Sequence, residues 1–138
     1  MKKHQSGIAL LEALIAILVL AIGLMGTIGM QARAYSAMND ASMRAEATMA
    51  AERLLGIMAV DQANLTNYAY SGSGTPSASL AGWYGDTRNN IRGATIVVVV
   101  TPVAGVNRSA VDITINWLRK AGAQQGKHVV TAYIAQSS

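Results

Sequence analysis

The feature that most constrains this chain is an apolar run at residues 8–30, whose only charged residue is Glu12. As an α-helix rising about 1.5 Å per residue, the run would extend over roughly 35 Å, enough to cross a bilayer core of about 30 Å. A soluble single-domain enzyme has no need of such a segment. We therefore expect a membrane-spanning helix, and Lys2 and Lys3 in front of it favour a cytoplasmic N-terminus.

Glu12 has two interpretations. It lies near one end of the span, where a carboxylate can snorkel and costs less than the roughly 2.5–3.5 kcal/mol typical of the helix centre. Alternatively, a cut after Gly7 would make Ile8 the new N-terminus and place its ammonium one turn from Glu12. At about 4 Å and an effective dielectric near 20, such a pair attracts by about 4 kcal/mol before desolvation. The ammonium could belong to the same chain or to a neighbouring copy.

Charge and residue types exclude several classes of function. The net charge of +4 comes from scattered basic residues, without the dense basic stripe that follows phosphates, so we expect no nucleic acid as a main partner. Cysteine is absent, which excludes disulfides, thiol catalysis and cysteine-based metal sites. His4 and His128 are too few for a metal site, and His128 is expected on an exposed strand position. We predict no enzyme and no cofactor.

The helix is predicted to continue to about Ala59, because residues 31–60 are rich in helix formers and contain no proline. Asp40 and Arg44 lie four residues apart and can pair on its exposed side. Small and apolar residues recur at helical spacing and predict the side that packs on the rest of the protein. This predicted side consists of Ala34, Ala37, Ala41, Ala45, Met49 and Leu54 or Leu55.

Residues 61–92, rich in Gly, Ser, Asn and Pro, are predicted to be a loop-rich connector. Three strand-like runs follow within residues 93–138, at 94–103, 109–118 and 127–135. The second alternates, with Val111, Ile113, Ile115 and Trp117 on one side. Short connections rich in turn-forming residues favour an antiparallel meander. The predicted fold is α+β: a long N-terminal helix whose outer half covers a small antiparallel sheet.

The N-terminal pattern resembles the class III signal of type IV pilins and pseudopilins. A short basic leader (residues 1–7) ends in Gly7, a hydrophobic residue follows, and a glutamate is the fifth residue after the cut. Here these positions are Gly7, Ile8 and Glu12, with Ile8 in place of the usual Phe. The segments "IGLMG", "MAAERLL" and "ITINWL" are most similar to PilV-type minor pilins.

The resemblance implies a pilin fold and a sequence of events. Prepilin peptidase would cut between Gly7 and Ile8 and methylate the new amine of Ile8. The protein would wait in the inner membrane, with residues 8–30 in lipid and its C-terminal part in the periplasm. It would then join a pilus, where Glu12 aids docking and the other minor pilins and the major pilin are its partners. A minor pilin of this type would prime assembly, at the tip of the filament.

Three glycines at spacing three, Gly23, Gly26 and Gly29, lower helix stability by about 1 kcal/mol each relative to Ala and permit close helix approach. We expect this part of the helix to loosen when it leaves lipid for the filament.

Three alternatives stay open from the sequence. A minor pseudopilin of a type II secretion system would share the cleavage signal and Glu12. An adhesive pilin would bind a surface or DNA through the exposed segment Ser71–Gly82 or a sheet edge. A secreted domain would instead be cut at Ala34 within "ARA", as by an ordinary signal peptidase.

Overall fold

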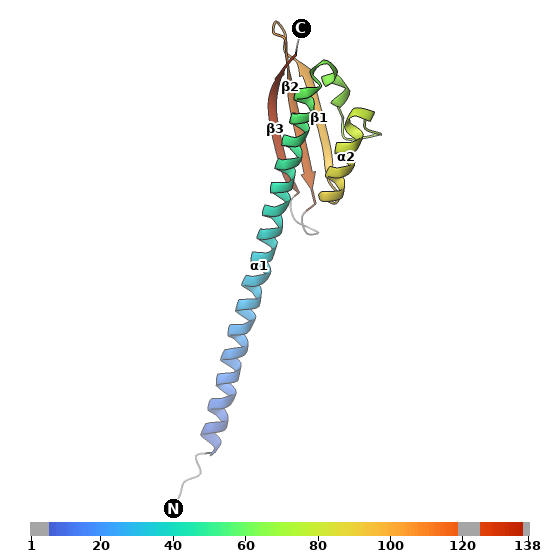
Figure 1. Cartoon of the computed structure of the whole chain (residues 1–138). Helices are drawn as coiled ribbons and strands as arrows, with labels where there is room; N and C mark the ends of the chain where they lie inside the picture. Colours follow the sequence, from blue (N-terminus) through green and yellow to red (C-terminus); the bar gives the residue numbers. More distant parts are fainter. Residues whose placement is uncertain (1–5, 119–124, 137–138) are drawn as a thin grey trace, which may run out of the picture. The chain divides into compact units, whose positions relative to one another are not determined.

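The computed structural model describes residues 6–118 and 125–136 of the chain (Figure 1). Its first element is the α-helix α1 (Ser6–Val60), which agrees with the helix predicted from Ile8 to about Ala59. By its contacts the chain divides into two compact units, residues 1–39 and 40–138. The remaining elements are the 3-10 helix η1 (Gln62–Tyr68), the helix α2 (Ala78–Asn90) and the strands β1 (Thr95–Pro102), β2 (Arg108–Trp117) and β3 (Gly126–Ala135).

The three strands form an antiparallel sheet of order β1-β2-β3, which confirms the predicted meander. The β1–β2 ladder runs from Thr95 opposite Asn116 to Pro102 opposite Ser109, so pairing ends at the proline as expected. The β2–β3 ladder runs without a break from Arg108 opposite Ala135 to Trp117 opposite Gly126. The connection after β2 lies largely outside the described residues.

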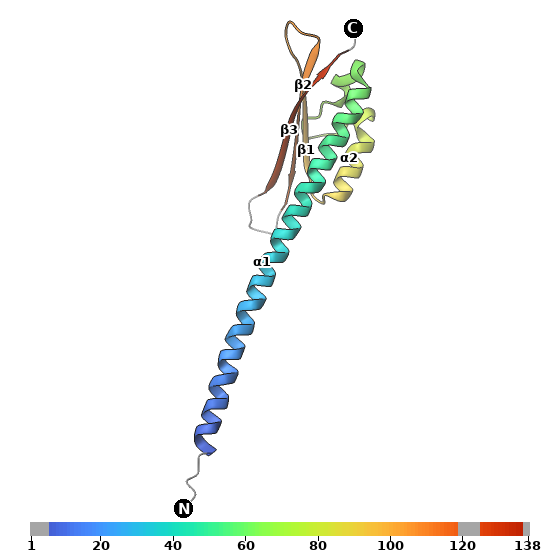
Figure 2. The same ribbon diagram turned by 60° about the vertical axis from the view of Figure 1, so that its left-hand side comes forward.

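The core of the second unit lies between the sheet and two helices. The predicted inward side of β2 is fully buried, and the second half of α1 runs alongside the sheet in both views (Figures 1 and 2). This confirms that the outer part of the long helix covers the sheet. The buried residues that form this layer are Ala47, Ala51, Leu54 and Met58 of α1, Leu80 and Trp83 of α2, Ile96 and Val98 of β1, and Val111, Ile113, Ile115 and Trp117 of β2.

The predicted packing side of α1 was wrong in its phase. Met49 keeps 54% of its surface exposed and Ala45 is exposed, whereas Ala47 and Met58 are fully buried. Alanine occurs on every side of this helix, so the spacing of small residues could not distinguish one side from another. The large side chains Leu54 and Met58 decide which side is buried, because they remove the most apolar surface from water.

The connector predicted to be loop-rich, residues 61–92, contains more helix than expected. Residues 78–90 form α2, although the helix contains Gly82 and Gly85, which disfavour helical structure. The side chain of Ser77 caps it by accepting a hydrogen bond from Leu80 N–H (3.3 Å). Burial of Leu80, Trp83 and Thr87 on one side stabilises the helix. The sequence signals that we overlooked are a serine cap after Pro76 and apolar residues at three-to-four spacing.

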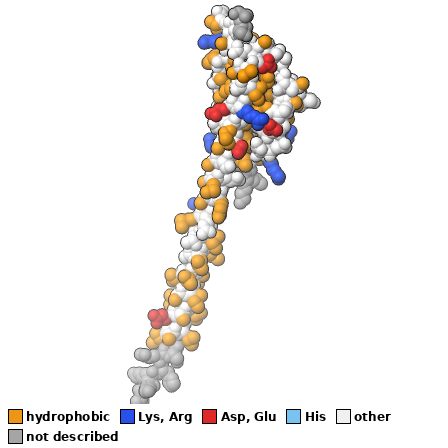
Figure 3. Space-filling model, in the orientation of Figure 1, with side chains coloured by type: hydrophobic (Ala, Val, Ile, Leu, Met, Phe, Trp, Pro, Cys, Tyr) orange, Lys and Arg blue, Asp and Glu red, His pale blue; other side chains and the backbone are white. Residues whose placement is uncertain are grey.

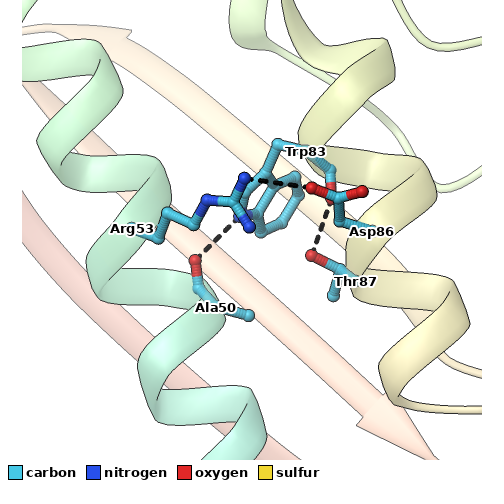
Figure 4. A network of polar contacts seen from close by, with 5 residues as sticks. All are labelled: Ala50, Arg53, Trp83, Asp86 and Thr87. Atoms are coloured by element: carbon cyan, nitrogen blue, oxygen red, sulfur yellow. Dashed lines mark hydrogen bonds and ion pairs between the residues drawn. The ribbon is translucent and has the colours of Figure 1, made fainter.

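Polar contacts fix α2 to α1 (Figure 4). The indole Nε1–H of Trp83 donates to the backbone oxygen of Ala50 at 2.8 Å, and the Trp83 side chain is 4% exposed. Beside it, Arg53 pairs with Asp86 at 3.0 Å. Because both charged side chains are more than half exposed, this pair contributes little, and the buried indole contact is the stronger link.

Two tryptophans allow this contact to be measured. Trp117 is as buried as Trp83, but its Nε1–H has no hydrogen-bond partner in the part of the chain that the structure describes. We expect Trp83→Phe to lower the free energy of unfolding by about 0.5–1.5 kcal/mol more than Trp117→Phe, because only the first removes a hydrogen bond. Denaturant unfolding of the two variants in detergent measures the difference. Equal losses would show that the Trp83–Ala50 contact contributes nothing.

Candidate functional site

The N-terminal half of α1 exposes apolar side chains on every side. All residues from Ile8 to Met38 are exposed; Ile8 shows 70% of its surface and Met25 76%. The most apolar window of this helix has a mean hydropathy of 2.8, and none of it is buried. Figure 3 shows hydrophobic side chains along this part of the chain. Such a surface requires lipid or neighbouring helices to cover it, and its length and composition are sufficient to cross a membrane.

Residues 8–30 contain two polar side chains, Thr27 and Glu12, and these differ in their hydrogen bonds. Thr27 donates its hydroxyl hydrogen to the backbone oxygen of Leu24 at 2.8 Å, so its polar hydrogen is satisfied even in hydrocarbon. Glu12 is exposed and makes no hydrogen bond or ion pair with any other described residue. A carboxylate in an otherwise apolar span, without a partner among the residues that the structure describes, is available to another cation.

The Gly7–Ile8 bond lies in the first turn of α1, which begins at Ser6. The first turn of a helix has unpaired backbone N–H groups and frays easily. Ile8 and Glu12 are four residues apart on the same helix, which places them on one side of it. The structure therefore brings together the three residues that the sequence grouped. Lys2 and Lys3 lie outside the described residues.

The three glycines of the span form an open stripe. A Cβ atom added at Gly23, Gly26 or Gly29 would meet nothing within 4 Å. Close packing inside the chain is therefore not the reason for these glycines. Their spacing leaves room on the helix surface where the backbone of a neighbouring helix can approach.

The segment Ser71–Gly82, considered above as an adhesive loop, is partly helical because α2 begins at Ala78. Its loop part is held by Tyr70, whose hydroxyl donates to the backbone oxygen of Gly74 at 3.1 Å. Tyr70 also contacts Tyr84 edge-on, with ring centres 5.2 Å apart. The hydrogen bond between the two hydroxyls raises the pKa of Tyr70 and, together with Arg88, lowers the pKa of Tyr84. These contacts order the loop.

The described residues contain no group of three or more His, Asp or Glu side chains that could hold a metal ion. His128 differs from its expected exposed position: it is half-buried on β3, and its Nε2 is buried without a hydrogen-bond partner among the described residues. The candidate site is therefore the exposed half of α1.

Residues 2–28 match the family model of the prokaryotic N-terminal methylation motif. The chain carries the processing motif of type IV pilin-like proteins. The matched segment contains Gly7, Ile8 and Glu12, and it precedes a long helix packed on a three-stranded antiparallel sheet, a pilin-like α+β fold. No curated protein and no solved structure matches the chain.

The motif implies processing by prepilin peptidase and assembly with pilins. Pilin-like proteins are structural proteins rather than enzymes. The motif and the exposed apolar helix together indicate a stage in the inner membrane before assembly into a pilus or pseudopilus.

Proposed function

We propose that this chain is a minor pilin of the type IV pilus that primes or promotes pilus assembly. Prepilin peptidase cuts between Gly7 and Ile8 and methylates Ile8. The chain then leaves the inner membrane through side-by-side packing of α1 with other pilins. The observation that carries this proposal is the N-terminal part of the chain itself: residues 2–28 match the methylation motif, and residues 8–30 are exposed on all sides and include the carboxylate of Glu12, which has no partner among the described residues.

The minor rather than major role is supported by similarity to PilV-type proteins in "IGLMG", "MAAERLL" and "ITINWL". Minor pilins of this type form a small complex that starts the filament, so we place this chain at the pilus tip. Its partners are the other minor pilins, the major pilin and, before assembly, membrane lipid.

Mass spectrometry of the mature protein tests the processing step. We expect an N-terminal peptide that begins at Ile8 and carries one additional methyl group, with the leader 1–7 absent. The uncut chain from a strain without prepilin peptidase is the control. A mature protein that begins at Tyr35 would identify an ordinary secreted domain and would refute the proposal.

The open glycine stripe gives a separate prediction. Replacing Gly23, Gly26 and Gly29 together by Ala should stabilise this helix by about 1 kcal/mol per residue. Because the added Cβ atoms meet nothing in the chain, the substitution should not disturb the fold. We expect fewer copies in sheared pili at an unchanged membrane level. Unchanged incorporation would show that neither loosening nor close approach at these glycines is required.

A minor pseudopilin of a type II secretion system is the alternative that shares the same cleavage motif and Glu12. Deleting the gene distinguishes the two systems: a loss of surface pili with normal protein secretion supports the pilus. A loss of secretion with normal pili would assign the chain to the pseudopilus.

A further inference from the structure

The two edges of the sheet differ in how they are covered. At the β1 edge, Tyr70 pairs with Val98: each backbone N–H donates to the other residue's oxygen at 2.8 Å. Within the described residues, no strand or bridge pairs with the outer edge of β3. Alternate residues of an edge strand direct their backbone N–H and C=O groups away from the sheet, so β3 offers a row of unpaired donors and acceptors.

The free edge of β3 has few of the usual protections against strand pairing. The strand spans Gly126–Ala135 without a proline and pairs residue by residue with β2, so it contains no bulge. Its only formally charged residue at neutral pH is Lys127, next to its first residue. Natural sheets block free edges with prolines, bulges, short strands or inward-facing charges. A long, regular and nearly uncharged edge is therefore suited to pairing.

The outward-facing side chains of β3 would contribute to such pairing. Val129 is 49% exposed and Tyr133 is 62% exposed. Thr131 lies between them and donates its hydroxyl hydrogen to Asp112 at 2.5 Å. Pairs of aromatic and β-branched residues across neighbouring strands contribute roughly 0.2–1 kcal/mol each, so an added strand would gain contacts on this side.

The charges along this edge indicate what kind of strand fits. Lys127 lies at one end, and at the other the guanidinium of Arg108 lies 4.9 Å from the ring centre of Tyr133. A second copy paired in parallel register would place Lys127 beside Lys127. Paired antiparallel about Thr131, it would place Lys127 opposite Ala135, about 10 Å from Arg108 at two strand spacings. The parallel arrangement places two cations side by side, and in neither arrangement does the β3 strand of the second copy bring a carboxylate to Lys127 or Arg108, because β3 contains no acidic residue; both points disfavour a second copy.

We propose that the β3 edge binds an extended strand of a different pilin-like subunit. The partner strand carries β-branched or aromatic residues opposite Val129 and Tyr133, and carboxylates near Lys127 and Arg108. This inference rests on the proposed function, because assembly by side-by-side helices brings the domains of different subunits next to one another. Pairing would extend the three-stranded sheet by one strand.

Site-specific photo-cross-linking in cells that make the full set of pilins tests the pairing. The photoreactive residue p-benzoylphenylalanine replaces Tyr133 on β3, or Val99 on β1 as the matched control. Val99 is 46% exposed, close to the 49% of Val129 on β3, but it lies on β1, at the edge of the sheet that Tyr70 covers. We expect the Tyr133 position to cross-link to a strand of another pilin-like subunit, and the Val99 position to give no such product.

A charge reversal provides the second measurement. Lys127→Glu should abolish the cross-link from position 133, because the carboxylate would face the acids of the partner strand, whereas the exposed control Glu52→Gln on α1 should leave it unchanged. No cross-link from position 133, a product containing two copies of this chain, or a linked residue in a partner helix would each overturn the inference.

Sheared pili from the same cells are assayed for the chain separately. Its absence from the pili counts against the proposed function, while the cross-link decides the strand pairing.

Discussion

Replacing Glu12 by Ala is expected to leave the chain in the membrane and to remove it from pili. Removal of the carboxylate makes insertion easier, because a charged residue within the span costs up to roughly 2.5–3.5 kcal/mol. Incorporation into pili should decrease. Glu12 has no partner among the described residues of its own chain, and the variant loses the attraction between this carboxylate and the ammonium of another subunit. That attraction is about 4 kcal/mol before desolvation, and a net loss of about 1.4 kcal/mol already lowers association tenfold.

Immunoblots of membrane fractions and sheared pili measure the two outcomes. Glu12→Gln keeps the size of the side chain and removes its charge, so it should behave as Glu12→Ala does. Glu52→Ala removes another exposed acid of α1 and is the matched control, with normal incorporation expected. Normal incorporation of both Glu12 variants would mean that Glu12 only snorkels at the membrane surface.

Gly126→Ala should destabilise the C-terminal unit more than any other substitution of a described glycine by alanine. A Cβ atom at this position would lie 2.1 Å from Trp117 Cε2 and 2.3 Å from Trp117 Nε1. Trp117 is 2% exposed and packed in the core, so its indole cannot move away without disturbing its neighbours. We expect a loss of about 1–3 kcal/mol or more in the free energy of unfolding, as for other overpacked cores.

Gly85→Ala is the matched control for this prediction. Gly85 lies on the exposed side of α2, where an added Cβ meets nothing within 4 Å. The substitution should raise stability by up to about 1 kcal/mol, because alanine favours a helix. Denaturant unfolding of the full chain in detergent, followed by tryptophan fluorescence, compares the two. A Gly126→Ala variant as stable as the unsubstituted chain would show that Trp117 repacks freely.

Elements with strong periodicity could be predicted from the sequence. The alternation of Val111, Ile113 and Ile115 predicted the buried side of β2, and turn-forming residues predicted the meander. The helix α2 could not be recognised by composition, because its two glycines and its polar residues are those of a loop. Burial of Leu80 and Trp83 against α1 and the sheet stabilises it, and such long-range contacts are invisible in local propensity.

For the candidate site, too, local features could be predicted from the sequence, whereas features that depend on long-range contacts could not. A cleavable bond and a glutamate at a set spacing are local features, so residues Gly7, Ile8 and Glu12 could be grouped from the sequence alone. The predicted meander already placed the third strand at an edge of the sheet. That the opposite edge, at β1, is bridged by Tyr70 depends on a contact distant in sequence and required the structure. The phase of α1 likewise required the structure, since alanines surround the helix.

The meander also bears on how quickly the C-terminal unit can fold. Each strand pairs with its neighbour in sequence, so the sheet closes through short loops, and low contact order is associated with fast folding. In the orientation that we propose, the valine-rich strand β1 would cross the membrane before its partner β2, and β3 would cross last. Rapid local pairing shortens the time during which these apolar strands are open to aggregation. A chain without disulfides must rely on this kinetic protection until its core forms.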